Sequence, residues 1–117
     1  MKDFSFPGIY RIKRSSEFVD IQGDNSKLYS RSLLILFRHT EQPFSRLGIV
    51  VSRKVDKKAV IRNRIKRHIR EIFRHEHDRF TQSIDMVVIA RAEAVRSNLW
   101  EIRKDFTYAL KKGGVLK

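Results

Sequence analysis

The 117-residue chain contains no cysteine, which excludes a disulfide framework, a cysteine-based zinc site and a thiol nucleophile. It has no apolar run of the roughly 18 residues that a transmembrane helix needs, and its N-terminus lacks the apolar stretch of a secretory signal. We therefore expect a cytoplasmic protein with no segment that spans a membrane. Glycine and proline number only 5 and 2, and no repeat or linker-like tract interrupts the chain. These features predict a single domain over residues 1–117.

Acidic residues are also few, with 13 Asp and Glu against 26 Lys and Arg, so the formal net charge is +13. A charge of this size opposes folding through self-repulsion, and it is typical of proteins that bind polyanions. Hydrophobic residues make up 41% of the chain, which is enough for a core and too much for a disordered basic tail. Nucleic acid is the favoured partner, and an anionic membrane surface is the alternative.

The apolar pattern predicts an alternation of strands and helices. The expected elements are a short helix capped by Ser15 or Ser16, strands at 28–37, 46–53 and 84–89, a helix at 57–74, and a final helix capped by Ser97. The helix at 57–74 lies between two strands, so these three elements form a βαβ unit. We therefore expect an α+β fold, an α/β sandwich with a small mixed sheet.

The predicted helix at 57–74 has one apolar stripe and one strongly basic face. The stripe consists of Ile61, Ile65, Ile69, Ile72 and Phe73, at the spacing that packs a helix on a sheet. Between residues 53 and 74 there are ten Lys and Arg but only two acidic residues, and Arg67–Glu71 is the only compensating i, i+4 pair. An external anion explains this self-repelling face better than solvation alone, and arginine suits phosphate geometry. A helix-turn-helix reader of DNA would need two short helices, whereas this helix is single and lies between strands. A helix on a membrane surface would expose its apolar stripe, which is needed here to cover the sheet. We therefore expect no membrane partner.

Two sequence blocks in this region carry a family resemblance. The block RLGIVVSRK at 46–54 is followed by AVIRNRIKRHIRE at 59–71, with Arg-Asn-Arg at its centre. Together they resemble the bacterial ribonuclease P protein component. Tyr10-Arg11-Ile12 with Phe18, the strand IDMVVIAR at 84–91 and the terminal helix extend the similarity over roughly the whole chain. The resemblance implies a ribosomal protein S5 domain 2-like fold with a left-handed βαβ crossover.

The resemblance also implies a function. Members of the family form a ribonucleoprotein that removes the 5′ leader from precursor tRNA, with the catalytic centre and its Mg²⁺ in the RNA subunit. This chain would then be a non-catalytic, monomeric protein subunit that binds the RNA subunit and precursor tRNA and holds no metal itself. The expected RNA-binding residues are Arg53, Lys54, Arg62, Asn63, Arg64, Lys66, Arg67, Arg70 and Arg74. Asn63 either fixes a backbone or base contact or caps locally.

A second surface is implied for the single-stranded leader, a cleft in which aromatic side chains stack on bases. The residues expected in it are Phe18, Phe37 and Arg46, although Phe18 serves equally well as a core aromatic. The chain departs from the family at Gln22 and Leu33, where aromatic residues are common. Tyr29 and Phe37 are the possible substitutes.

Two other functions remain as alternatives. A general RNA-binding module of related fold would bind structured RNA without promoting cleavage, and a self-sufficient nuclease would need protein carboxylates or histidines at a cleft. The nearest local cluster is His75-Glu76-His77-Asp78. Its two histidines point to different helix faces, so we expect a mobile polar connection there and not a metal site.

Overall fold

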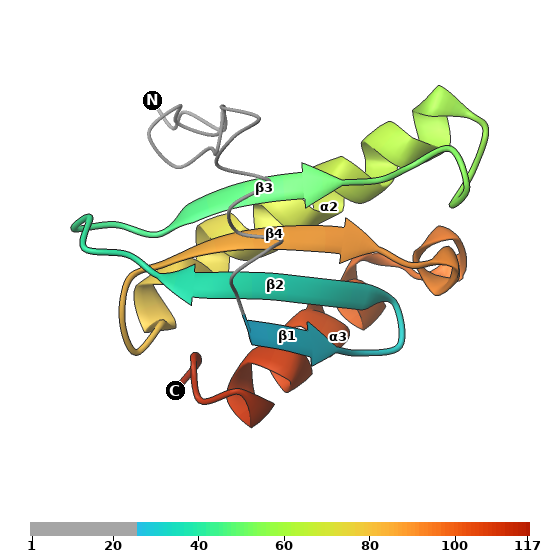
Figure 1. Cartoon of the computed structure of the whole chain (residues 1–117). Helices are drawn as coiled ribbons and strands as arrows, with labels where there is room; N and C mark the ends of the chain where they lie inside the picture. The colour runs from blue at the N-terminus through green and yellow to red at the C-terminus, as the bar shows by residue number, and fades with distance from the viewer. Residues whose placement is uncertain (1–25) are drawn as a thin grey trace, which may run out of the picture.

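A computed structural model describes residues 26–117, which form a four-stranded sheet covered on one face by two helices (Figure 1). The predicted first helix, with Phe18 and Gln22, lies outside the described residues. The strands are β1 (Ser26–Tyr29), β2 (Leu33–His39), β3 (Arg46–Val50) and β4 (Ile84–Ala90), in the order β1-β2-β4-β3. The β1–β2 and β2–β4 pairs are antiparallel and β3–β4 is parallel, so the sheet is mixed as predicted.

The single strand predicted at 28–37 is wrong, because the chain turns back within it. Ser30 to Ser32 form a tight turn between β1 and β2, closed by a 2.9 Å hydrogen bond from the Ser30 amide to the Leu33 carbonyl. The Ser30 hydroxyl donates to the same carbonyl oxygen. Serine side chains that form hydrogen bonds with the nearby backbone favour a turn over continuation of the strand. The apolar run of β2 that follows is a stronger pattern and led to the prediction of one continuous strand.

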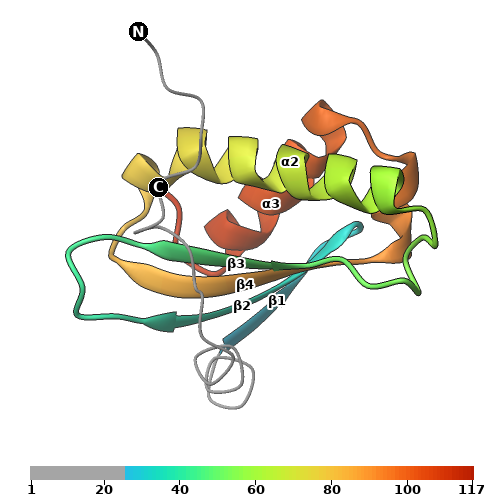
Figure 2. The same cartoon turned by 90° about the horizontal axis from the view of Figure 1, so that it is seen from above.

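Helices α2 (Ala59–Glu76) and α3 (Leu99–Lys112) lie side by side on the same face of the sheet (Figure 2). The 3₁₀ turns η2 (His77–Arg79) and η3 (Ala92–Arg96) connect them to β4. In Figure 1, β3 and β4 run to the right with β3 above β4, and α2 returns behind them. The β3–α2–β4 crossover is therefore left-handed, as the resemblance implied.

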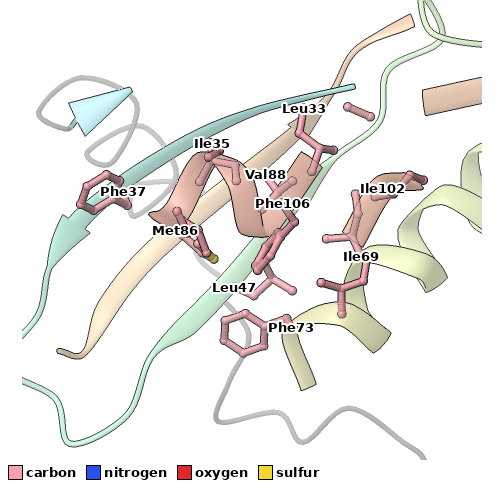
Figure 3. Packing of buried hydrophobic residues seen from close by; sticks show 14 of the residues in the cluster. Leu33, Ile35, Phe37, Leu47, Ile69, Phe73, Met86, Val88, Ile102 and Phe106 are labelled. Atoms are coloured by element: carbon pink, nitrogen blue, oxygen red, sulfur yellow. The ribbon is translucent and has the colours of Figure 1, made fainter. Parts of the chain in front are cut away.

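The main core lies between the helices and the sheet (Figure 3). Ile69 and Phe73 of α2 and Phe106 of α3 are fully buried against alternate residues of the strands, such as Met86 and Val88. Phe37 belongs to this core, because its side chain lies on the helix face of β2 and is only 7% exposed. The leader-cleft role predicted for Phe37 therefore finds no support, since a side chain buried among helices cannot stack on a base.

Helix α3 begins one residue later than predicted, with Asn98 and not Ser97 as its N-cap. The Asn98 side chain accepts from the Glu101 amide, and the Glu101 carboxylate accepts from the Asn98 amide, both at 2.9 Å, which forms a capping box. Ser97 is buried; its hydroxyl donates to the Glu93 carbonyl and accepts from Arg31.

Glu76, at the end of α2, joins both helices through a buried ion network. Its side chain is 1% exposed, and it accepts hydrogen bonds from Arg79 at 2.6 Å and from Arg103 of α3 at 2.9 and 2.6 Å. The mobile polar connection predicted around residues 75–78 is therefore wrong. A buried carboxylate requires such partners. Arg79 lies at i, i+3 spacing from Glu76, whereas Arg103 is 27 positions away and helical spacing does not reveal it.

Candidate nucleic-acid interface

The basic residues predicted from the sequence gather along the outer side of α2 and the loop that precedes it. The structure leaves Arg53, Lys54, Asn63 and Arg67 exposed, and Arg62, Arg64, Lys66, Arg70 and Arg74 half-buried. The helix can present them together because its apolar stripe, including Ile65, Ile69 and Ile72, faces the sheet. Arg53, Lys54 and Lys57 also line a recess of about 390 Å³ before the helix begins.

Arg62 holds the loop that leads into α2. Its Nη1 donates to the carbonyl oxygens of Asp56 at 3.0 Å and Lys57 at 2.8 Å. The Asp56 carboxylate in turn accepts from the Lys58 amide at 2.8 Å. These bonds hold the chain at Asp56–Lys58 in a tight turn before the helix, a few residues after Arg53 and Lys54.

Arg64 attaches α2 to η3. Its Nη2 donates to the Val95 carbonyl at 2.8 Å, across 31 residues of sequence. Its Nε is buried and has no hydrogen-bond partner within residues 26–117. Both arginines of the Arg-Asn-Arg segment thus have structural hydrogen bonds, and the intervening Asn63 points its side chain into solvent.

Glu71 does not form the predicted pair with Arg67. Its carboxylate instead accepts from Arg74 at 2.7 Å and interacts with His75 at 2.8 Å. Burial raises the pKa of Glu71, but the hydrogen bonds and charges of Arg74 and His75 outweigh that effect, so its pKa lies below the usual value. Arg67 remains exposed, and within residues 26–117 it has no ion-pair partner.

The face of the sheet opposite the helices carries a row of charged side chains. Asp85 of the central strand β4 is directly paired with Arg46 of β3 and Arg38 of β2. Arg46 binds it through two hydrogen bonds of 2.9 and 2.8 Å, and Arg38 lies 3.6 Å away. Arg46, which the sequence analysis expects in the leader cleft, thus lies on the sheet face opposite α2 and α3. Tyr29, also on this face and 59% exposed, lies 5.8 Å from the Arg91 guanidinium.

The described residues contain no cluster of three or more His, Cys, Asp or Glu side chains that could hold a metal ion. The carboxylates that are buried, Glu76 and Asp85, are each bound by arginines. Among the same residues, no helix is long and apolar enough to cross a membrane.

Comparison with known proteins decides the family. The family model described as ribonuclease P matches residues 6–114. The chain belongs to the ribonuclease P protein family. The ribonuclease P protein component of Geobacillus sp. strain WCH70 is 38% identical over 109 residues, which cover 92% of this chain and 93% of the relative. That of Geotalea uraniireducens is 33% identical over 112 residues, covering 96% and 97%.

Solved structures of ribonuclease P proteins share the fold. That from Staphylococcus aureus at 2.0 Å superposes with a TM-score of 0.83 and 34% identity, over 92% of this chain and 98% of the other. That from Thermotoga maritima gives a TM-score of 0.79 and 35% identity, over 87% and 96%. Membership in the ribonuclease P protein family implies that this chain is a subunit of an endoribonuclease.

Replacing Asn63 by alanine tests whether this central residue of the ribonuclease P motif contacts RNA. Its side chain is exposed and forms no hydrogen bond within residues 26–117, so the free energy of unfolding should change by less than about 0.5 kcal/mol. RNA affinity should fall, because the amide can both donate and accept. Urea unfolding and filter binding measure the two effects. A large loss of stability with unchanged affinity would show a structural role instead.

We expect His68 to make the stability of this ribonuclease P protein depend on pH. Burial, and then repulsion from Arg64 and Arg67, lowers the pKa of His68 below its ordinary value, and its Nδ1 is buried without a partner in the described chain. Because the folded pKa lies below the unfolded one, the unfolded chain takes up more protons as pH falls below about 6.5. The His68 contribution is therefore complete above that pH and is lost as pH falls toward the folded pKa.

Urea unfolding of the wild type and of His68→Gln at pH 8 and pH 5 measures this contribution. The wild type should lose more stability than the variant on acidification, and the difference isolates His68 from the other histidines. Equal losses would show that His68 does not titrate differently in the two states.

Sequence analysis of this ribonuclease P protein did not reveal the roles of three residues that make long-range contacts. Asp85, Glu76 and Arg91 each form a long-range ion pair, hydrogen bond or ring contact. One signal was available for Asp85: a lone carboxylate inside the apolar run IDMVVIA requires a cationic partner.

Proposed function

We propose that this chain is the protein subunit of ribonuclease P, and that it binds the catalytic RNA subunit through the basic side of α2. The RNA subunit would supply the catalytic centre and Mg²⁺, and the holoenzyme would remove the 5′ leader of precursor tRNA. The observation that carries this proposal is the concentration of exposed cations along α2 and the loop that precedes it. Arg53, Lys54 and Arg67 have no ion-pair partner within residues 26–117, so phosphates can neutralise them.

The sheet face opposite the helices suits the leader. Arg38 and Arg46 lie on this face, where both side chains contact the carboxylate of Asp85. Tyr29 adds an exposed ring beside Arg91, and aromatic rings bind unpaired bases with little sequence preference. Two RNA segments would thus contact opposite sides of one monomeric protein.

Reconstitution with a bacterial ribonuclease P RNA subunit at low Mg²⁺ tests the proposal. The protein should increase leader cleavage over RNA alone, and cleavage should give the mature 5′ end. Binding to the RNA without any gain in cleavage would support a general RNA-binding module instead. Cleavage by the protein without RNA would indicate a self-sufficient nuclease and overturn the assignment of the catalytic centre to RNA.

A further inference from the structure

Helix α3 presents an exposed tryptophan on the side that faces away from the sheet. Trp100 is 71% exposed, although burying an indole is ordinarily favourable. Lys104 lies one turn later and Lys111 two further turns along, so the three side chains share one face of the helix. Ile102 and Phe106 occupy the opposite face, which is buried in the core.

A fixed guanidinium stands beside the indole. The Arg103 Cζ lies 5.9 Å from the centre of the Trp100 ring. The two hydrogen bonds from Arg103 to the buried Glu76 hold the guanidinium in this place. We call Trp100, Arg103, Lys104 and Lys111 the α3 platform.

Acidic side chains of α3 do not neutralise the lysines of the α3 platform. The Glu101 carboxylate is used in the capping box. Asp105 binds the Ser32 hydroxyl and lies 3.2 Å from Arg31, toward the β1–β2 turn. Within residues 26–117, Lys104 and Lys111 therefore have no ion-pair partner.

The α3 platform lies next to the basic side of α2. The two helices pack side by side on one face of the sheet (Figure 2), and the Glu76–Arg103 pair joins them. An RNA that covers the outer side of α2 therefore reaches α3 without crossing the sheet. The α3 platform would extend the same contact area by one aromatic ring and two unneutralised cations.

We propose that the α3 platform binds an unpaired segment of the RNA subunit, with one base stacked on Trp100 and adjacent phosphates beside Lys104 and Lys111. The combination fits RNA because unpaired bases stack on aromatic and guanidinium planes while lysines neutralise the backbone. An apolar protein partner fits less well, since a guanidinium lies beside the ring and two lysines share its face of the helix. This inference rests on the proposed function, because it takes the RNA subunit as the occupant.

Trp100 is the only tryptophan of the chain, so its fluorescence reports on this one position. Stacking on a nucleobase quenches indole emission. Titration of the protein with the RNA subunit should give saturable quenching at one protein per RNA. Precursor tRNA alone should not quench it at the same concentrations.

Substitutions then measure the energetic contribution of the platform. Trp100→Ala should weaken RNA-subunit binding about tenfold, and Trp100→Phe should restore most of the affinity because it keeps a stacking ring. Lys104→Gln with Lys111→Gln should lower the slope of log affinity against log salt by about 1.4–1.8. Lys112→Gln is the matched control, since Lys112 lies on another flank of α3 beside Tyr108, and its slope should equal that of the wild type.

The outcomes separate this inference from the proposed function. Unchanged Trp100 fluorescence and wild-type affinity of Trp100→Ala, with normal stimulation of leader cleavage, would overturn the α3 platform and leave the proposed function standing. Quenching by precursor tRNA and not by the RNA subunit would overturn the assigned occupant. Absence of both RNA-subunit binding and stimulated cleavage would overturn both proposals.

Discussion

Simultaneous replacement of Arg53, Lys54 and Arg67 by glutamine is expected to weaken binding of the RNA subunit on the order of 100-fold at 0.15 M salt. Each phosphate contact contributes about 0.7–0.9 to the slope of log affinity against log salt, which corresponds to roughly four- to fivefold in affinity at this salt. The three side chains are exposed and have no ion-pair partner within residues 26–117, so their charges are available to RNA.

Filter binding between about 0.05 and 0.5 M salt measures both quantities, and the slope should fall by about 2–3. Folding should be unaffected or slightly improved, because the substitutions remove repulsion. The matched control removes the same charge elsewhere, by replacing Lys27, Lys112 and Lys117 with glutamine, and should keep the wild-type slope. An unchanged slope in the test variant would show that these side chains touch no phosphate.

Arg62 and Arg64 should behave differently from this group, because each already donates to backbone carbonyls. Loss of Arg62 frees the loop that holds Arg53 and Lys54, so RNA affinity would fall through lost positioning. The expectation that all three residues of the Arg-Asn-Arg segment bind RNA therefore omits the structural hydrogen bonds that Arg62 and Arg64 form.

Replacing Asp85 by alanine is expected to destabilise the protein by about 2–4 kcal/mol and to lower Tm by about 10–20 °C. The Asp85 side chain is only 2% exposed, and Arg46, which binds it at two points, is 17% exposed. Removing the carboxylate leaves the largely buried Arg46 side chain without its bidentate partner. Breaking a buried ion pair in this way destabilises a protein more than replacing both partners by apolar side chains.

Thermal and urea unfolding measure this effect. Glu41→Ala removes an exposed carboxylate in the β2–β3 turn and should change stability by less than about 0.5 kcal/mol. The double variant Asp85→Ala with Arg46→Met should recover part of the loss, because it also removes the largely buried cation that Asp85 binds in the wild type. A loss for Asp85→Ala no larger than that for Glu41→Ala would show that the row on this face does not stabilise the sheet.

The parts of the fold that the sequence predicts are those fixed by local periodicity. The helix predicted at 57–74 is observed at 59–76, and the strand predicted at 84–89 is observed at 84–90, because both have long, regular apolar patterns. The turn at Ser30–Ser32 is difficult to predict from the sequence because it has only three residues and lies directly before the long apolar run of β2. Strand order cannot be obtained from periodicity, since β2 pairs with β4 and not with its neighbour β3.

The candidate site was predicted in its composition but not in its internal bonding. Helical spacing placed the cations on one side of α2 correctly, because that side is determined by the apolar stripe. It paired Glu71 with Arg67, whereas Arg74 and His75 bind Glu71. The sequence analysis also predicted Phe37 in the leader cleft. Phe37 alternates with Leu34 and Leu36 along β2 and lies on the same side as Leu33 and Ile35, which faces the core. Side-chain choice among several cations depends on tertiary contacts that spacing does not contain.

The left-handed crossover determines which side of the sheet each functional surface occupies. A right-handed connection between β3 and β4 would lay α2 over Asp85 and Arg46, and the basic helix and the arginine row would cover each other. The observed hand places them on opposite sides, separated by the thickness of the core and the sheet. In the proposed complex the protein is then a rigid spacer, and the distance between the RNA subunit and the leader is set by its core packing. Mutations that decrease or increase the thickness of that core should shift the position of cleavage before they lower the affinity for either RNA.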